Sequence, residues 1–136
     1  GDPEPLPRDI QESIRTAQAK SAGNTAITVN IALNYGGRAE LLHGVKALAR
    51  ECAAGRLDPE SITEEDIARQ LYTAGQPDPD LIIRPSGEQR LSNFLMWQSA
   101  YSELLFMNVL WPDFTPEHLN YALYQYSLRS RRFGGV

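Results

Sequence analysis

Cysteine is nearly absent from this sequence of 136 residues, since Cys52 is the single one and cannot form an internal disulfide. A chain without disulfides is typical of the cytoplasm, and we expect Cys52 to be a buried thiol on a helix. No apolar run approaches the roughly 18–20 residues of a membrane-spanning helix, and no charged, apolar leader is visible at the start. His43 and His118 lack partners at zinc-ligand spacing. Phosphate-binding glycine loops and Ser/His/Asp patterns are also missing. These absences predict a cytoplasmic protein that does not span a membrane and holds no zinc.

Basic residues are outnumbered, because 13 Lys and Arg stand against 17 Asp and Glu, for a net charge of −4. A general nucleic-acid binder is usually basic, so we predict no nucleic-acid partner. The arginines gather in places: Arg84 and Arg90 bracket a Gly/Ser turn, and Arg129, Arg131 and Arg132 cluster near the C-terminus. Arginine binds phosphate oxygens in a bidentate manner, which favours a small anionic ligand. Ion pairing on a solvated surface is an equally good explanation of these clusters at this point.

The hydrophobic pattern predicts helices and strands that alternate along the chain. Helices are expected at residues 10–22, 41–52, from 63 to about 71, 92–101 and from 115 onward, and strands at 26–35, 81–83 and 104–109. Residues 26–35 (AITVNIALNY) are β-branched or aliphatic and nearly uncharged, as in a strand buried on both faces. The alternation indicates an α/β fold with a mostly parallel sheet flanked by helices. Three strands make a small sheet of this kind, so we expect further strands outside this sequence.

Candidate binding residues concentrate after the strand that ends at Arg84. Ligands of open α/β sheets bind beyond the carboxyl ends of the strands. A tight Pro-Ser-Gly turn follows Arg84, and Arg90 and Ser92 come just before a predicted helix, whose N-terminus would attract phosphate. The arrangement favours a site for a diphosphate. The alternative is that Arg84 pairs with Glu88 or Asp80 and that the turn has only a structural role.

Glu103 stands where a predicted helix ends and an apolar strand begins. A carboxylate at the edge of a buried strand needs a partner. Mg²⁺ often takes only one or two protein carboxylates and completes its shell with water and phosphate oxygens. Position alone supports a structural salt bridge equally well.

The glycines of the NYGGR sequence at residues 34–38 separate a predicted strand from a predicted helix. They could allow a ligand to approach the backbone closely or simply form the turn. We favour the turn.

Three stretches of the sequence resemble one family. The string IRPSGEQRLSNFLMWQSAYSELLF at residues 83–106, with LWPDF at 110–114, closely resembles the C-terminal signature of the cis-prenyltransferases. The nearest members are bacterial isoprenyl transferases of the undecaprenyl diphosphate synthase type. GNTAITVNIALNYGGR at 23–38 and SLRSRRFGG at 127–135 resemble the same family. The match covers essentially the whole chain, and implies that residues 1–136 are one domain portion, the C-terminal half of a synthase-like fold.

The resemblance implies a reaction and a set of site residues. These transferases condense isopentenyl diphosphate with an allylic diphosphate such as farnesyl diphosphate, need Mg²⁺, and build polyprenyl diphosphates for cell wall biogenesis. By motif, Glu103 corresponds to the Mg²⁺-binding glutamate, expected to act across the dimer interface, and Asn93, Phe94 and Trp97 to framework residues. The residues that correspond to substrate-binding positions are Arg84, Arg90, Leu91, Ser92, Arg132 and Gly134.

The family's N-terminal Asp-Gly-Asn-Gly-Arg-Trp type motif, which binds the allylic diphosphate and supplies the essential aspartate, does not occur here. We therefore expect no catalytic residue in this half and an incomplete enzyme that is inactive alone. The resemblance also implies a homodimer in the cytoplasm, with peripheral membrane contact when product is released. Two other functions stay open: a non-catalytic accessory subunit of a cis-prenyltransferase, and a phosphate-binding α/β module.

Overall fold

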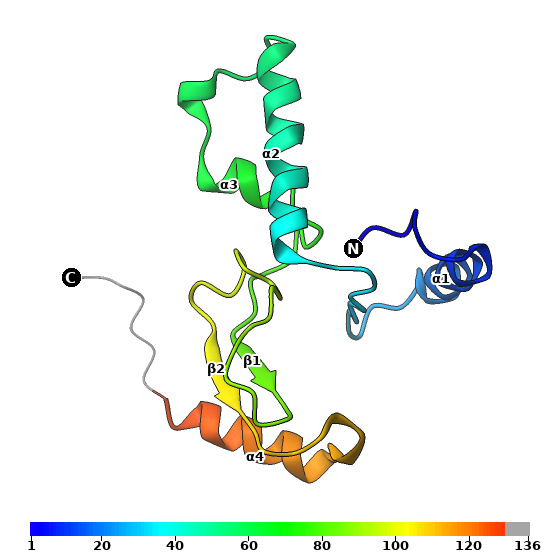
Figure 1. Ribbon diagram of the computed structural model, residues 1–136, viewed down its shortest axis with the longest axis vertical. Helices are drawn as coiled ribbons and strands as arrows, with labels where there is room; N and C mark the ends of the chain where they lie inside the picture. Colours follow the sequence, from blue (N-terminus) through cyan, green and yellow to red (C-terminus); the bar gives the residue numbers. More distant parts are fainter. Residues whose placement is uncertain (130–136) are drawn as a thin grey trace.

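The computed structural model describes residues 1–129 and contains helices around a small parallel sheet (Figure 1). The elements in chain order are α1 (Arg8–Ser21), α2 (Gly37–Ala53), the 3₁₀-helix η1 (Pro59–Ser61), α3 (Glu64–Ala68), β1 (Leu81–Arg84), β2 (Glu103–Phe106), the 3₁₀-helix η2 (Trp111–Asp113) and α4 (Pro116–Ser127). The strands β1 and β2 pair in parallel, with Leu81 opposite Glu103 and Arg84 opposite Phe106. The predicted fold class, an α/β fold with a parallel sheet, is confirmed.

Two of the helices, α3 and α4, begin at capping boxes. The Thr63 hydroxyl accepts from the Asp66 backbone N–H, and the Asp66 carboxylate accepts from the Thr63 N–H, which starts α3. At α4, Thr115 stands before Pro116, and its backbone N–H donates to Nδ1 of His118 at 3.1 Å. Such reciprocal bonds satisfy donors that a helix start otherwise leaves open. No helix within residues 1–129 is long and apolar enough to cross a membrane.

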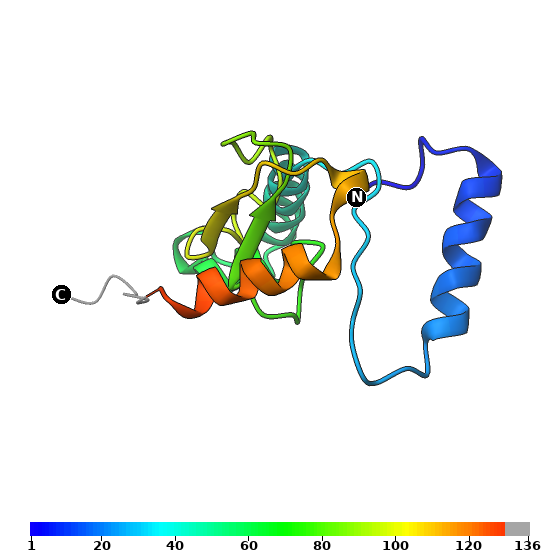
Figure 2. The same cartoon turned by 90° about the horizontal axis from the view of Figure 1, so that it is seen from below.

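The helices pack unevenly around the sheet. α2 packs against α3, and α4 lies against β2 (Figure 1). α1 stands apart from the other helices in both views, and none of its residues is buried (Figures 1 and 2). The apolar core of the described residues is small and consists of Leu48, Leu71, Ile82, Met107 and Ala122. Cys52 on α2 is only half-buried, so the expectation of a buried thiol was wrong.

The strand predicted at residues 26–35 does not form. The segment is extended and exposed, with Ile27 77%, Val29 72% and Ile31 76% exposed. Its side chains have the composition of a buried strand, but no neighbouring strand among the described residues pairs with it. Strand formation depends on such neighbours more than on intrinsic preference. Near the C-terminal end of the segment, the Asn34 side-chain amide donates a hydrogen bond to the Asp2 carbonyl at 2.9 Å.

The helix predicted at residues 92–101 is also wrong, since the segment is a series of turns. Ser92, Asn93 and Leu95 all have positive φ, at 49°, 65° and 46°. A right-handed helix cannot include such residues. The strand predicted at 104–109 is shorter, because β2 begins one residue earlier and ends at Phe106.

Candidate functional site

The turn after β1 brings the two predicted arginines onto one carboxylate. Nη2 of Arg84 donates to Glu88 Oε2, and Nη2 of Arg90 lies 2.7 Å from Glu88 Oε1. The hydrogen bond from Arg84, followed by the charges of Arg90 and Arg84, holds the pKa of Glu88 below its ordinary value. Two guanidinium groups therefore share one negative charge, which leaves an excess of one positive charge at the carboxyl end of β1.

The backbone of this turn is fastened to the chain that follows β2. Ser86 N–H donates to the Val109 carbonyl at 2.7 Å, and Gly87 N–H donates to the Met107 carbonyl at 2.9 Å. Both donors have positive φ, 78° and 71°. A Cβ on Gly87 would lie 3.1 Å from Oδ1 of Asn108, so glycine suits this position for both conformation and space. These two hydrogen bonds fasten the turn at residues 84–90, called the arginine turn below, to the chain that follows β2.

One donor of the arginine turn has no acceptor. Nε of Arg84 is buried and makes no hydrogen bond with any residue in the described part of the chain. Burying an N–H without an acceptor is costly, and such groups in native structures usually have a reason. An anion that draws the guanidinium group away from Glu88 would supply the missing acceptor.

Ser92 and Leu91 lie on the turns that follow Arg90, and they do not begin a helix. The expected attraction of phosphate by a helix N-terminus at Ser92 was therefore wrong. The next residue, Asn93, instead contacts the start of α2. Its carbonyl accepts from Gly37 N–H at 2.7 Å, and its Oδ1 accepts from Arg38 N–H at 2.8 Å. The turn containing Ser92 is thereby joined to α2.

The two glycines of NYGGR make this contact possible. A Cβ on Gly36 would lie 2.7 Å from Nδ2 of Asn93, and a Cβ on Gly37 would lie 2.7 Å from Cγ of Met96. Both glycines have negative φ or an extended backbone, so space rather than a left-handed turn requires them. The preferred interpretation, that these glycines only form a turn, was incomplete: they permit the close approach of another segment of the chain.

A buried carboxylate that the sequence analysis missed lies one turn into α2. Glu40 is 1% exposed and accepts from the Tyr35 hydroxyl at 2.5 Å and the Tyr72 N–H at 2.7 Å. The side-chain amide of Gln98, itself 2% exposed, donates to both Glu40 oxygens at 3.3 and 3.2 Å, and to Thr73 Oγ1 at 3.0 Å. Burial, and then the bond to Glu40, raise the pKa of the Tyr35 hydroxyl.

The spacing of Glu40 could have revealed it. Glu40, Gly44 and Leu48 recur at intervals of four along α2, and all three are buried. A carboxylate on the buried stripe of a helix requires donors from other segments. The same rule that identified Glu103 therefore applied to Glu40 as well.

Glu103 lies away from the arginine turn. It pairs with Leu81 at the first position of the sheet, whereas Arg84 pairs with Phe106 at the last, so the two are roughly 10 Å apart along the strands. Its Oε2 accepts from Nη1 of Arg129 at 2.5 Å. Within residues 1–129 no group of three or more His, Cys, Asp or Glu side chains could hold a metal ion. A lone carboxylate still suits Mg²⁺ where phosphate and water complete the shell, but the ion has to displace Arg129.

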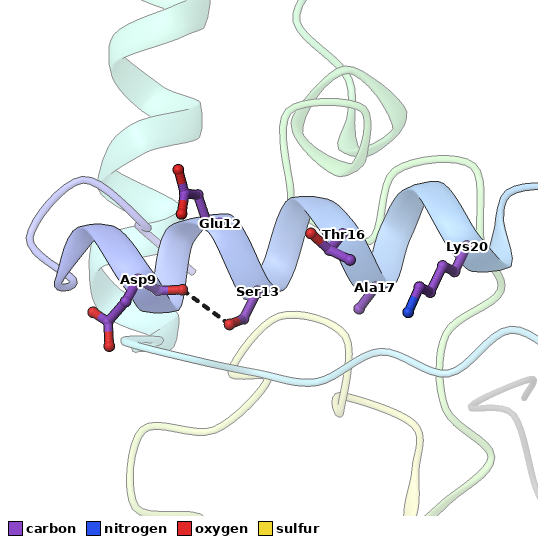
Figure 3. A pocket seen from close by; sticks show the side chains of 6 residues that line it. All are labelled: Asp9, Glu12, Ser13, Thr16, Ala17 and Lys20. Atoms are coloured by element: carbon purple, nitrogen blue, oxygen red, sulfur yellow. Dashed lines mark hydrogen bonds between the residues drawn. The ribbon is translucent and has the colours of Figure 1, made fainter.

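A cavity of about 800 Å³ lies between α1, the extended segment and the loop after Tyr72. Glu40 and Tyr35 reach its wall, beside mostly apolar neighbours that include Ile14, Val29, Ile31, Leu33, Phe94 and Leu95. A second hollow, of about 610 Å³, is lined by α1 alone, through Asp9, Glu12, Ser13, Thr16, Ala17 and Lys20 (Figure 3). One helix face without a second wall is not a candidate site. Neither space is lined by Arg84 or Arg90.

Arg132 and Gly134 lie outside the described residues, and their predicted contacts with substrate stay predictions. The structure brings Arg84 and Arg90 together through Glu88 and links Ser92 to α2 through Asn93. It does not bring Glu103 to them. The assignment of all these residues to substrate or metal also stays a prediction.

The parallel sheet and its helices place the chain among the α/β proteins, a class whose ligands generally bind beyond the carboxyl ends of the strands. Within that class, the profile of the prenyltransferase family described as "Putative undecaprenyl diphosphate synthase" matches residues 1–134. The chain therefore belongs to this family, as the resemblance indicated.

Curated relatives are isoprenyl transferases. The transferase of Rhizobium meliloti is 57% identical over 136 residues, which is 100% of this chain and 55% of that protein. The transferase of Clostridium tetani is 48% identical over 136 residues, again 100% of this chain, and 53% of that protein. The chain spans about half the length of the curated relatives it matches.

Solved structures agree with the fold. Lavandulyl diphosphate synthase of Lavandula x intermedia, solved with dimethylallyl diphosphate, superposes with a TM-score of 0.96 at 38% identity, over 99% of this chain and 58% of that chain. "A probable undecaprenyl diphosphate synthase" from Campylobacter jejuni superposes with a TM-score of 0.84 at 30% identity, over 99% of this chain and 61% of that chain. The predicted synthase-like fold is confirmed, over the part that this chain spans.

Proposed function

We propose that this chain is the isopentenyl-diphosphate-binding part of a Mg²⁺-dependent cis-prenyltransferase, which condenses isopentenyl diphosphate with an allylic diphosphate. One observation carries the proposal: two arginines share a single carboxylate at the carboxyl end of β1, and Nε of Arg84 has no acceptor within residues 1–129. A diphosphate supplies several acceptor oxygens and the negative charge that balances the excess. Membership of the isoprenyl transferase family supports this choice of anion.

Each residue of the turn has a role in holding substrate. Arg84 and Arg90 bind phosphate oxygens through their guanidinium groups, with geometry that lysine cannot supply. The Ser92 hydroxyl donates a further hydrogen bond, and Leu91 spaces the serine from Arg90. None of these groups breaks or forms a bond. They accelerate condensation by orienting the double bond of isopentenyl diphosphate toward the allylic carbon.

Glu103 is the residue that we propose for Mg²⁺. When bound, this ion stabilises the negative charge of the departing diphosphate. Since Glu103 stands at the opposite end of the sheet from Arg84, it serves the site of a second copy in a homodimer rather than its own turn. Exposed apolar side chains on η2 and α4 support such an interface, and they are Trp111, Leu119, Tyr121, Leu123 and Tyr124. Large exposed aromatic side chains are typical of protein contacts.

The chain is also proposed to be the C-terminal portion of one larger domain and to be inactive alone. Its extended segment at residues 26–35 has the composition of a buried strand but is exposed, and its relatives are about twice as long. An undecaprenyl-type product, a place in the cytoplasm, and transient membrane contact at product release complete the proposal. Detectable turnover of farnesyl and isopentenyl diphosphates by the purified chain alone would contradict the claim of inactivity.

Calorimetric titration of the purified chain with isopentenyl diphosphate tests the binding role. We expect Arg84→Ala to weaken binding about tenfold or more, because a charge-assisted hydrogen bond is lost. Arg56→Ala is the matched control, since Arg56 forms an exposed ion pair with Glu51 at the end of α2, outside the arginine turn. Equal affinities of wild type and Arg84→Ala would refute the proposed site. Equal binding of inorganic phosphate, without any effect of Mg²⁺, would instead indicate the phosphate-binding module.

A further inference from the structure

The start of α2 is capped by a residue far along the chain. Gly36, which precedes the helix, offers no side-chain acceptor. The first N–H groups of a helix have no partner within it. Two of them are satisfied by Asn93, whose carbonyl accepts from Gly37 and whose Oδ1 accepts from Arg38, 55 residues earlier. Asn93 therefore connects α2 directly to the turn that carries Ser92.

The conformation of this turn depends on outside support. Ser92 and Asn93 have φ of 49° and 65°, a region that non-glycine residues seldom adopt without compensation. The absence of side chains at Gly36 and Gly37 allows Asn93 and Met96 to approach α2. Within the turn, the Phe94 N–H donates to the Leu91 carbonyl at 3.0 Å across Ser92, and the bonds from Asn93 attach this turn to α2.

A second contact fixes the far end of the same segment. Gln98 is 2% exposed and donates to both oxygens of Glu40, one turn into α2. The segment from Asn93 to Gln98 is thus attached to the first turns of α2 at both of its ends. Motion of Ser92 relative to the helix is limited chiefly by the contact at Asn93, which is its immediate neighbour.

We propose that Asn93 is a positioning residue for the diphosphate site, a role that rests on the proposed function of Arg90 and Ser92. By capping α2 with both its carbonyl and its Oδ1, Asn93 holds its neighbour Ser92, whose hydroxyl then meets the same anion as Arg90. Asn93 does not itself contact substrate. Its role is to keep the turn in one conformation before the ligand binds, which lowers the entropy cost of binding.

Two substitutions distinguish the hydrogen bond to the Asn93 side chain from the hydrogen bond to its backbone carbonyl. Asn93→Gly tolerates positive φ and retains the carbonyl for Gly37, but removes the acceptor for Arg38. Asn93→Asp retains both acceptors and places its charge at the positive end of α2. Asn24→Gly is the matched control, since Asn24 is exposed in the turn after α1.

Hydrogen exchange of the purified chain, followed at single amides, measures positioning without a ligand. We expect Asn93→Gly to raise the exchange of two amides about fivefold, in proportion to one lost hydrogen bond. They are the amide of Arg38, which loses its acceptor, and the amide of Phe94, which donates to the Leu91 carbonyl across Ser92. The Kd for inorganic pyrophosphate should rise by a similar factor. Asn93→Asp should restore both within about twofold of wild type, and Asn24→Gly should change neither.

The outcomes distinguish this inference from the proposed function. Unchanged exchange at Phe94 in Asn93→Gly overturns the positioning role, whatever the affinity. Faster exchange with an unchanged Kd also overturns it, because the order of the turn then does not matter for binding. If wild type binds no pyrophosphate, the proposed function of the turn fails, while exchange at Phe94 still decides whether Asn93 orders it.

Discussion

Replacing Glu40 with alanine should destabilise the protein by several kcal/mol, about 3–4, because it leaves buried donors without an acceptor. Glu40 is 1% exposed and accepts from the Tyr35 hydroxyl, the Tyr72 N–H and the Gln98 amide. Each buried donor left without an acceptor costs about 1–3 kcal/mol. Tyr35 and Tyr72 are partly exposed and can recover a bond to water, so we expect a total of about 3–4 kcal/mol, near the low end of that sum.

Urea unfolding followed by far-ultraviolet circular dichroism measures this loss as a lower midpoint with an unchanged slope. Glu40→Gln is the isosteric comparison: it retains one acceptor oxygen but turns an NH₂ group toward donors, and should cost about 1–2 kcal/mol. Leu42→Ala is the control, because Leu42 is 54% exposed on the same helix and its loss should change stability by no more than about 0.5 kcal/mol.

The order of the three variants in urea midpoint tests whether the hydrogen bonds of Glu40 stabilise the protein. If Glu40→Ala unfolds at the same urea concentration as Leu42→Ala, the hydrogen bonds of Glu40 do not hold α2 against the segment that contains Gln98. If Glu40→Gln is as damaging as Glu40→Ala, the negative charge rather than the acceptor geometry is what the donors require.

Two further predictions concern other titratable or charged groups. The raised pKa of Tyr35 means that the unfolded chain loses this proton first as pH passes about 10, so stability should fall above that pH. Urea midpoints at pH 9 and 11 should therefore drop less in Tyr35→Phe than in wild type, and an equal drop would exclude Tyr35 as the cause. Arg129→Gln should strengthen Mg²⁺ binding several-fold, because Arg129 no longer competes for Glu103. Calorimetric titration with MgCl₂ measures this, with Glu103→Gln as the variant that should not bind, and an unchanged Kd in Arg129→Gln would count against Glu103 as a ligand.

The elements that the sequence predicts correctly are those whose signals are local. The apolar spacing of α1 and α2, the capping box at Thr63 and the Thr115-Pro116 start of α4 all lie within one element. A few neighbouring residues determine such features, and distant contacts change them little. The parallel pairing of β1 with β2 follows from the alternation of strands and helices.

The two failed elements depend on contacts that no local pattern contains. Residues 26–35 have strand composition, but a strand forms only with a partner, and the described residues contain none for it. Residues 92–101 have apolar spacing that suits a helix, yet Asn93 caps α2 and Gln98 binds Glu40. These bonds to a helix more than 50 residues away hold the segment in turns, against its local preference.

Contacts between distant residues also limit how far the charged groups of the candidate site can be predicted from the sequence. Residue types that bind a diphosphate or Mg²⁺ are also those that pair with one another, so a sequence can name the groups but not their partners. Arg84 pairs with Glu88, and Glu103 pairs with Arg129, as the structural alternatives for both had allowed. A diphosphate competes with one carboxylate for two arginines, and it brings more charge than that carboxylate. Ion pairs of this kind, partly open to water, are weak enough to exchange, so the pairing seen here is compatible with a site that opens to its ligand.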